Sequence, residues 1–97
     1  MIASFRDKTT EDLYHGRNTK ELRKFPIDIV KTVLRKLDLL NAATNLGDLR
    51  SYPGKHLKTL SGNLEGFYGM RINDQRRIIF QWEEKNAHNV MLTDYHA

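Results

Sequence analysis

The sequence predicts an α+β fold in which N-terminal helices pack on one face of a small, mainly antiparallel β-sheet. Between residues 26 and 41 the apolar residues recur with the 3.6-residue period of a helix. After Pro53 and Gly54 the period changes to two, and turn residues separate three short apolar runs. Helices that precede a block of strands are typical of an α+β domain.

Size and composition limit the possible classes of protein. The 97 residues predict a single domain over residues 1–97. The absence of cysteine excludes disulfides and thiolate metal sites. No apolar run approaches the roughly 20 residues that cross a bilayer, and the first residues lack the apolar stretch of a secretory signal. We therefore expect a cytoplasmic protein with no membrane partner. The net charge of +4 favours a polyanionic partner such as RNA or DNA.

The first expected elements are short. Residues 1–5 alternate weakly and predict a short first strand. Residues 7–14 predict a helix, because Glu11 and Asp12 lie near its N-terminus, where acidic side chains complement the helix dipole. Gly16 is typical of a helix end.

A longer helix is expected after Phe25, with Pro26 at its first position. The helix should end within residues 41–44, and residues 45–48 read either as a turn or as a short second piece. Four residues define the apolar face and two widen it: Ile27, Val30, Leu34, Leu37, Val33 and Leu40. Three cationic residues are expected off this face: Lys31, Arg35 and Lys36.

Three strands are expected in the second half, at residues 67–72, 76–83 and 89–94. Residues 73–75 and 84–88 contain the polar residues of their connections. Residues 56–60 are compatible with one further strand.

Alternation of side chains fixes how the first two of these strands pair. In the later strand, residues 78, 80 and 82 are apolar and share one face. In the earlier strand, residues 68, 70 and 72 share one face in the same way. Both apolar sets can face the helices only if the loop has an odd number of residues, most simply residues 73–75. Arg71 and Arg77 then sit opposite each other on the sheet face away from the helices.

Two arginines directly opposite each other repel, unless an anion lies between them. The planar, permanently charged guanidinium group suits phosphate. Alternatively, both side chains splay into solvent or pair with Asp94 or Glu83. If Val90 and Leu92 face the core, the same parity places Tyr95 on the arginine side. It places Asp94 and His96 on the other side at the end of the chain.

A second basic segment precedes the strands and holds candidate RNA-binding residues: Arg50, Lys55 and His56. These groups suit a phosphate backbone, although the segment taken alone favours a solvated, charged loop. Lys58 is the best placed of the segment to reach a catalytic position. The four histidines lack metal-ligand spacing, and no phosphate-binding glycine loop is present. We expect no metal site and no cofactor.

Several segments taken together resemble a known family: LKTLSGN at 57–63, EGFY at 65–68, MRINDQRRIIF at 70–80 and DYH at 94–96. The chain resembles the HigB-type toxins of the RelE/ParE toxin–antitoxin superfamily. The resemblance implies a RelE-like α+β fold and cleavage of mRNA in translating ribosomes. It also implies inhibition by a cognate helix-turn-helix antitoxin of the HigA type.

The resemblance also implies site residues by position. Arg71 and Arg77 occupy the family's basic sheet positions, and the terminal tripeptide at 94–96 matches its functional C-terminal segment. Some relatives carry histidine at or near Lys58, so either Lys58 or His56 fills that role. Arg76 stands where relatives often have tryptophan and forms a doubled basic pair with Arg77, which makes it a further candidate for RNA binding.

These residues suggest a metal-independent endoribonuclease in which the RNA 2′-OH is the nucleophile. Arg71 and Arg77 would stabilise the phosphorane. Tyr95, His96 and Lys58 would share the acid, base and orienting roles, and Asp94 would orient His96 or hold an arginine. One alternative is a ParE-like toxin that binds DNA gyrase without cutting RNA. Another is a basic RNA-binding module, which binds RNA with a steep dependence on salt concentration and does not cut it.

Overall fold

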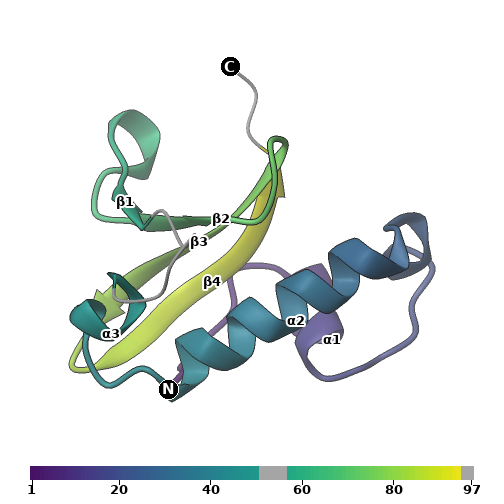
Figure 1. The fold of residues 1–97 in the computed structure, drawn as a ribbon, viewed down its shortest axis with the longest axis horizontal. Coiled ribbons are helices and arrows are strands. Elements are labelled where there is room, and N and C mark those ends of the chain that lie inside the picture. The colour runs from purple at the N-terminus through teal and green to yellow at the C-terminus, as the bar shows by residue number, and fades with distance from the viewer. Residues whose placement is uncertain (51–56, 95–97) are drawn as a thin grey trace.

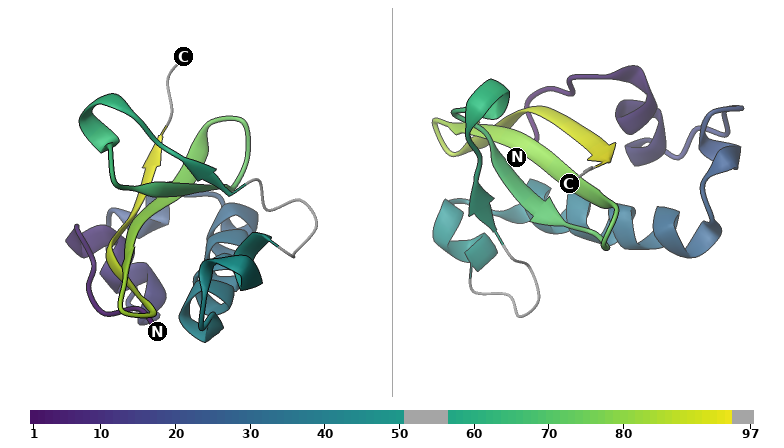
Figure 2. Two further views of the ribbon diagram at one scale, coloured as in Figure 1. Left: turned by 90° about the vertical axis from the view of Figure 1, so that its left-hand side faces the viewer. Right: turned by 90° about the horizontal axis from the view of Figure 1, so that it is seen from above.

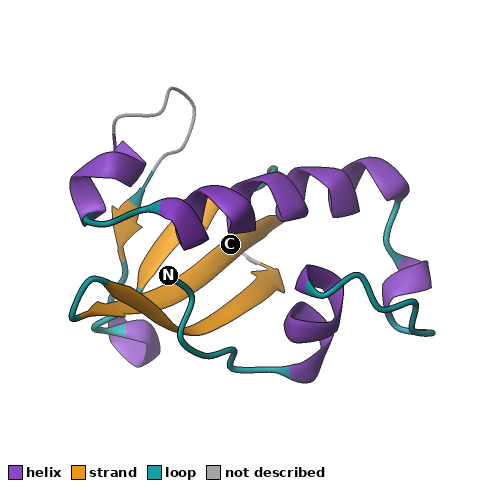
Figure 3. Ribbon diagram, turned by 90° about the horizontal axis from the view of Figure 1, so that it is seen from below, coloured by secondary structure: helices purple, strands orange, loops and turns teal. Residues whose placement is uncertain are grey.

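The computed structural model confirms the α+β architecture. It describes residues 1–50 and 57–94, in which two helices lie against one face of a four-stranded sheet (Figures 1 and 3). The strand order is β1-β2-β3-β4 and every neighbouring pair is antiparallel. No helix among the described residues is long and apolar enough to cross a membrane. The elements are α1 (Lys8–Tyr14), η1 (Leu22–Lys24), α2 (Ile27–Ala42), α3 (Leu46–Arg50), β1 (Lys58–Thr59), η2 (Gly62–Leu64), β2 (Tyr68–Arg71), β3 (Arg76–Glu83) and β4 (Asn86–Asp94).

The N-terminal segment runs alongside β4 instead of forming the strand expected at residues 1–5. It makes two isolated parallel bridges, Ile2 with Ala87 and Phe5 with Val90. The chain then enters α1, where the Asp7 carboxylate accepts a hydrogen bond from the Thr10 amide at 3.3 Å. Helix α1 ends as expected, because the positive φ of +73° at Gly16 turns the backbone away.

Asp12 ties the end of α1 to the segment that follows. Its carboxylate is 2.8 Å from the Arg17 guanidinium and 3.6 Å from Lys8 Nζ. The hydrogen bond from Arg17 lowers the pKa of the Asp12 carboxyl below its ordinary value, although burial opposes this effect. The ionised form is therefore favoured in the folded chain.

The Asp12→Asn variant is expected to be less stable than the wild type at neutral pH. The carboxylate's contribution is fully present above about pH 4, the pKa range of an unperturbed aspartate. It is lost as the pH falls through the lowered pKa in the folded chain. The free energies of unfolding of the two proteins, measured with urea from pH 7 down to pH 2.5, should become equal in acid. If the difference in unfolding free energy stayed constant across this range, ionisation of Asp12 would not be its cause.

Helix α2 covers the sheet, but its buried face is rotated from the one expected. Val33, Leu37 and Leu40 are fully buried, whereas Ile27 is 69% exposed. Lys36, expected off the apolar face, is buried and donates a hydrogen bond from Nζ to the Arg71 carbonyl at 2.9 Å. Pro26 is the N-cap and not the first helical residue.

The strands differ from expectation at one turn. A two-residue turn, Glu84 and Lys85, replaces the connection expected at residues 84–88, and both residues have positive φ, 52° and 67°. This is the mirror-image geometry that matches the twist of paired strands. Strand β4 therefore begins at Asn86, and one extra residue at Asn89 forms a bulge opposite β3.

The core lies between the helices and the sheet. Phe80, Ile78 and Met70 of the sheet are fully buried against Leu37 and Leu40 of α2. Among the described residues no α-helix covers the other sheet face, and the short 3-10 helix η2 lies on that side (Figure 2, right). We call this sheet face the arginine face, after Arg71 and Arg77.

Candidate functional site

Arg71 and Arg77 lie directly opposite each other on the arginine face, as the sequence predicts. They are paired residues of β2 and β3, and Arg77 is paired in turn with Thr93 of β4. Residues 73–75 form the loop between the strands. Within it the Asn73 side chain accepts hydrogen bonds from the amides of Gln75 and Arg76 at 2.9 and 2.8 Å. The odd-length loop thus fixes the pairing of the two arginines.

Lys58 joins the arginines on this face. It pairs with Gly69 of β2, which pairs with Ile79 of β3. Directly paired residues share a face, so Lys58 lies two residues, about 7 Å along the strands, from the row of Arg71 and Arg77. Its side chain is exposed. Three of the predicted catalytic residues are therefore brought together.

The side chain of Arg77 packs over Gly69 of the neighbouring strand. A Cβ at Gly69 would lie 3.5 Å from Arg77 Cδ and 3.4 Å from a methyl group of Leu60. The stem of Arg77 thus lies across the strand, its Nε is buried, and the residue is only half-exposed. Packing of the stem limits the positions that its guanidinium can take.

Arg71 is held from two sides. Its guanidinium forms an ion pair with Asp74 and donates a hydrogen bond from Nε to the Asn73 carbonyl at 3.3 Å. Its backbone carbonyl accepts the hydrogen bond from Lys36 of α2. The helix layer is thereby linked to the end of β2, where Arg71 meets Arg77.

Arg76 and Asp94 lie on the opposite, helix-covered face. They are paired residues of β3 and β4, and Arg76 Nε lies 3.5 Å from Asp94 Oδ1. The Arg76 guanidinium also lies 5.1 Å from the centre of the Phe25 ring. Asp94 thus forms its ion pair with Arg76. This agrees with the prediction that Asp94 lies on the sheet face opposite to Arg71 and Arg77.

The remaining predicted site residues are not brought to the arginine face by any described contact. Arg50 is exposed at the end of α3. Lys55, His56, Tyr95 and His96 lie outside the described residues. Within the described part of the chain, no group of three His, Cys, Asp or Glu residues could hold a metal ion.

One pair on the arginine face is absent from the sequence prediction. The Arg6 guanidinium lies 5.3 Å from the centre of the Phe67 ring. Residues 6 and 67 belong to no common element, so no periodicity connects them. Only the position of the N-terminal segment beside β4 brings Arg6 to this face.

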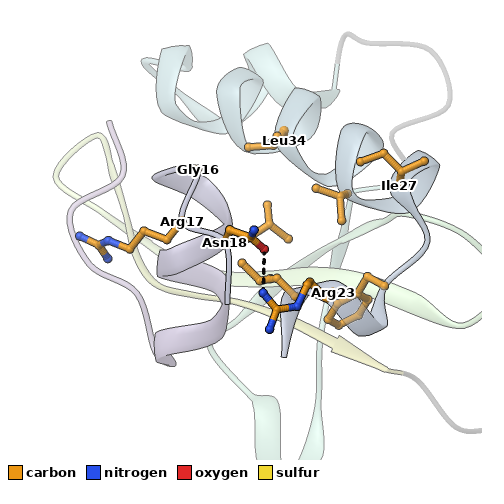
Figure 4. A pocket seen from close by; sticks show the side chains of 10 residues that line it. Gly16, Arg17, Asn18, Arg23, Ile27 and Leu34 are labelled. Carbon is orange, nitrogen blue, oxygen red and sulfur yellow. Dashed lines mark hydrogen bonds between the residues drawn. The ribbon is translucent and has the colours of Figure 1, made fainter. Parts of the chain in front are cut away.

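An apolar groove of about 500 Å³ lies on the helix side, between α1, η1 and α2 (Figure 4). Leu22, Phe25 and Leu34 are among its apolar lining residues, and Arg17 and Arg23 are among its polar ones. The groove shares no lining residue with the arginine row. Among the described residues, the apolar groove and the arginine row are therefore separate surfaces.

Comparison with known proteins gives concordant results. Residues 3–96 match the family described as the RelE-like toxin HigB of type II toxin–antitoxin systems. The chain is similar to Toxin HigB-1 of Vibrio cholerae serotype O1, with 40% identity over 92 residues and 95% of each chain covered. It is 29% identical to Endoribonuclease HigB of Proteus vulgaris over 96 residues, which cover 99% of this chain and 100% of the relative.

Solved structures show the same fold at lower identity. The YoeB-YefM complex from Staphylococcus aureus contains a chain with a TM-score of 0.62 and 18% identity, covering 100% of this chain and 99% of that one. The YoeB/ParE toxin from Agrobacterium tumefaciens gives a TM-score of 0.61 at 11% identity, covering 99% and 100%. These similarities support the fold alone.

Proposed function

Because the chain belongs to the RelE-like HigB toxins of type II toxin–antitoxin systems, we propose that it is an endoribonuclease that cuts mRNA on the ribosome and so inhibits translation. The observation that carries this proposal is the pairing of Arg71 with Arg77 beside Lys58 on the sheet face that no described α-helix covers. The end-to-end similarity to a relative named as an endoribonuclease supports it.

The proposed reaction uses the RNA's own 2′-OH as nucleophile. The 2′-oxygen forms a bond to phosphorus, the bond to the 5′-oxygen breaks, and the products carry a 2′,3′-cyclic phosphate and a 5′-OH. Arg71 and Arg77 stabilise the negative charge of the phosphorane. The RNA supplies the nucleophile and the arginines supply the positive charge, so the reaction proceeds without a metal ion.

Proton transfer falls to the C-terminal residues and Lys58. One group removes the proton of the 2′-OH and another delivers a proton to the departing 5′-oxygen. An imidazole titrates near neutral pH, which favours His96 for one of these roles. Tyr95 and Lys58 share the second role and the orientation of the phosphate. Either Lys58 or His56 fills the position at which some relatives of the family carry a histidine.

The partners follow from the same proposal. A YoeB chain of similar fold is solved in complex with YefM as a toxin–antitoxin pair. We propose that this chain is likewise inhibited by a cognate antitoxin, of the HigA-like helix-turn-helix type. Because the proposed substrate is mRNA on ribosomes, we propose a cytoplasmic location.

Mapping of RNA ends after brief expression is expected to reveal cuts within translated mRNA. The same purified protein should cut a defined mRNA with added ribosomes and more slowly, or not at all, without them. A DNA gyrase supercoiling assay run in parallel tests the ParE-like alternative. Inhibition of gyrase without RNA scission would replace the proposed function, and salt-dependent RNA binding without scission would reduce it to an RNA-binding module.

A further inference from the structure

A second cationic position lies at the far end of the arginine face, where Arg6 stacks on Phe67. The Arg6 backbone is fixed to the edge of β4, because its amide donates a hydrogen bond to the Val90 carbonyl at 2.9 Å. The preceding residue, Phe5, packs toward the helices, with its ring 5.7 Å from that of Tyr14. Arg6 is exposed and reaches the Phe67 ring instead.

Phe67 belongs to the arginine face by alternation. The next residue, Tyr68, is in β2 and stacks on Phe80 on the helix side, with ring centres 5.8 Å apart. Phe67 is half-buried and is not among the residues packed against the main core. Its backbone is fixed by the hydrogen bond that its carbonyl accepts from the Leu60 amide at 3.0 Å. The ring therefore gives Arg6 a rigid support.

The charge of Arg6 is not neutralised within the described part of the chain, where none of the ion pairs involves it. The second arginine–phenylalanine contact gives a direct contrast. Arg76 lies over Phe25 on the other face, but its guanidinium is paired with Asp94. Of Arg6 and Arg76, Arg6 is the one whose charge is not paired with a carboxylate among the described residues.

We propose that Arg6, oriented by Phe67, binds a phosphate of the RNA strand other than the one that is cut. Phe67 precedes Arg71 by four residues, about 13 Å along the strand. Arg6 is thus too far from the arginine row to act on the reacting phosphate. A guanidinium supported by an aromatic ring still presents its N–H groups to a phosphate oxygen. The inference rests on the proposed function, since it requires RNA to lie along this face.

The test measures the salt dependence of RNA binding. A short single-stranded 2′-O-methyl RNA, which lacks the free 2′-OH, is titrated with protein at several NaCl concentrations and followed by fluorescence anisotropy. For Arg6→Gln, the slope of log K against log[salt] should become shallower by about 0.7, the value for one phosphate contact on a single strand. Phe67→Leu should weaken binding while the slope stays that of the wild type, because the charge remains.

The matched control is Arg35→Gln, which removes the same charge from an exposed position on α2. Its slope should equal that of the wild type. In cleavage assays, Arg6→Gln should raise KM and leave kcat unchanged. This is the result expected when a variant loses a contact that is equally strong in the ground state and the transition state. Thermal unfolding of each variant confirms that it is folded.

Two negative results have different meanings. If wild-type protein binds and cuts RNA but Arg6→Gln keeps its slope and KM, the Arg6 assignment is wrong and the proposed function stands. If wild-type protein neither binds this RNA nor cuts mRNA in the presence of ribosomes, the proposed function fails, and this inference fails with it.

Discussion

Replacement of Arg77 by alanine is expected to lower the rate of RNA cleavage by about 10²–10³-fold, the usual effect of removing one donor that stabilises a developing oxyanion. Arg77 lies opposite Arg71, and its stem packs across Gly69. In the proposed reaction its guanidinium contacts the phosphate that is cut. Single-turnover cleavage of a ribosome-bound mRNA measures the effect on the chemical step.

Two further variants sharpen this result. Arg77→Lys keeps the charge but loses the planar fork, so its rate should fall between those of the wild type and the alanine variant. Arg35→Ala removes an exposed arginine from the helix layer and should cut RNA at the wild-type rate. A wild-type rate for Arg77→Ala would remove Arg77 from the catalytic site.

Truncation of the chain after Asp94 is expected to lower cleavage by about 10²–10⁴-fold, the range associated with one general acid or base. The truncation removes Tyr95 and His96, the two residues assigned to proton transfer and orientation. The described fold ends at Asp94, whose pairing with Arg76 remains in the truncated chain. Circular dichroism and RNA binding should therefore stay close to wild type while cleavage is lost.

The matched control is a chain that lacks only Ala97, which should cut RNA normally. The variant His96→Gln isolates the imidazole, and its cleavage rate should fall toward that of the truncated chain. If growth arrest and mRNA cleavage survive the loss of residues 95–97, proton transfer must come from elsewhere in the chain.

The pairing of the arginines could be predicted because strand periodicity is strict. A period of two leaves only odd loop lengths when both apolar sets must face the helices, and the register of Arg71 with Arg77 follows. The same alternation separated Asp94 from the arginine face. The sequence therefore predicted the part of the site that depends on backbone alternation along neighbouring strands.

Other features depend on contacts between distant segments. Lys36 is buried and donates a hydrogen bond from Nζ to the Arg71 carbonyl, and helix periodicity contains no information about that acceptor. Ile27 fits the apolar stripe, but it sits at the start of α2, where it remains exposed. The turn at Glu84 and Lys85 lacks the Asn-Gly residues typical of its geometry, which explains why the connection was expected to be longer.

The N-terminal segment has a consequence for solubility. The outer edge of β4 would otherwise present a row of unsatisfied amides to another molecule. The amides of Ala87 and Val90 instead donate to the Met1 and Ser4 carbonyls at 2.8 and 3.1 Å, and that of Leu92 donates to Thr10 Oγ1 at 2.9 Å. Loss of the first six residues would uncover an edge able to template strand pairing between molecules. The segment that brings Arg6 to the arginine face thus also protects the sheet from aggregation.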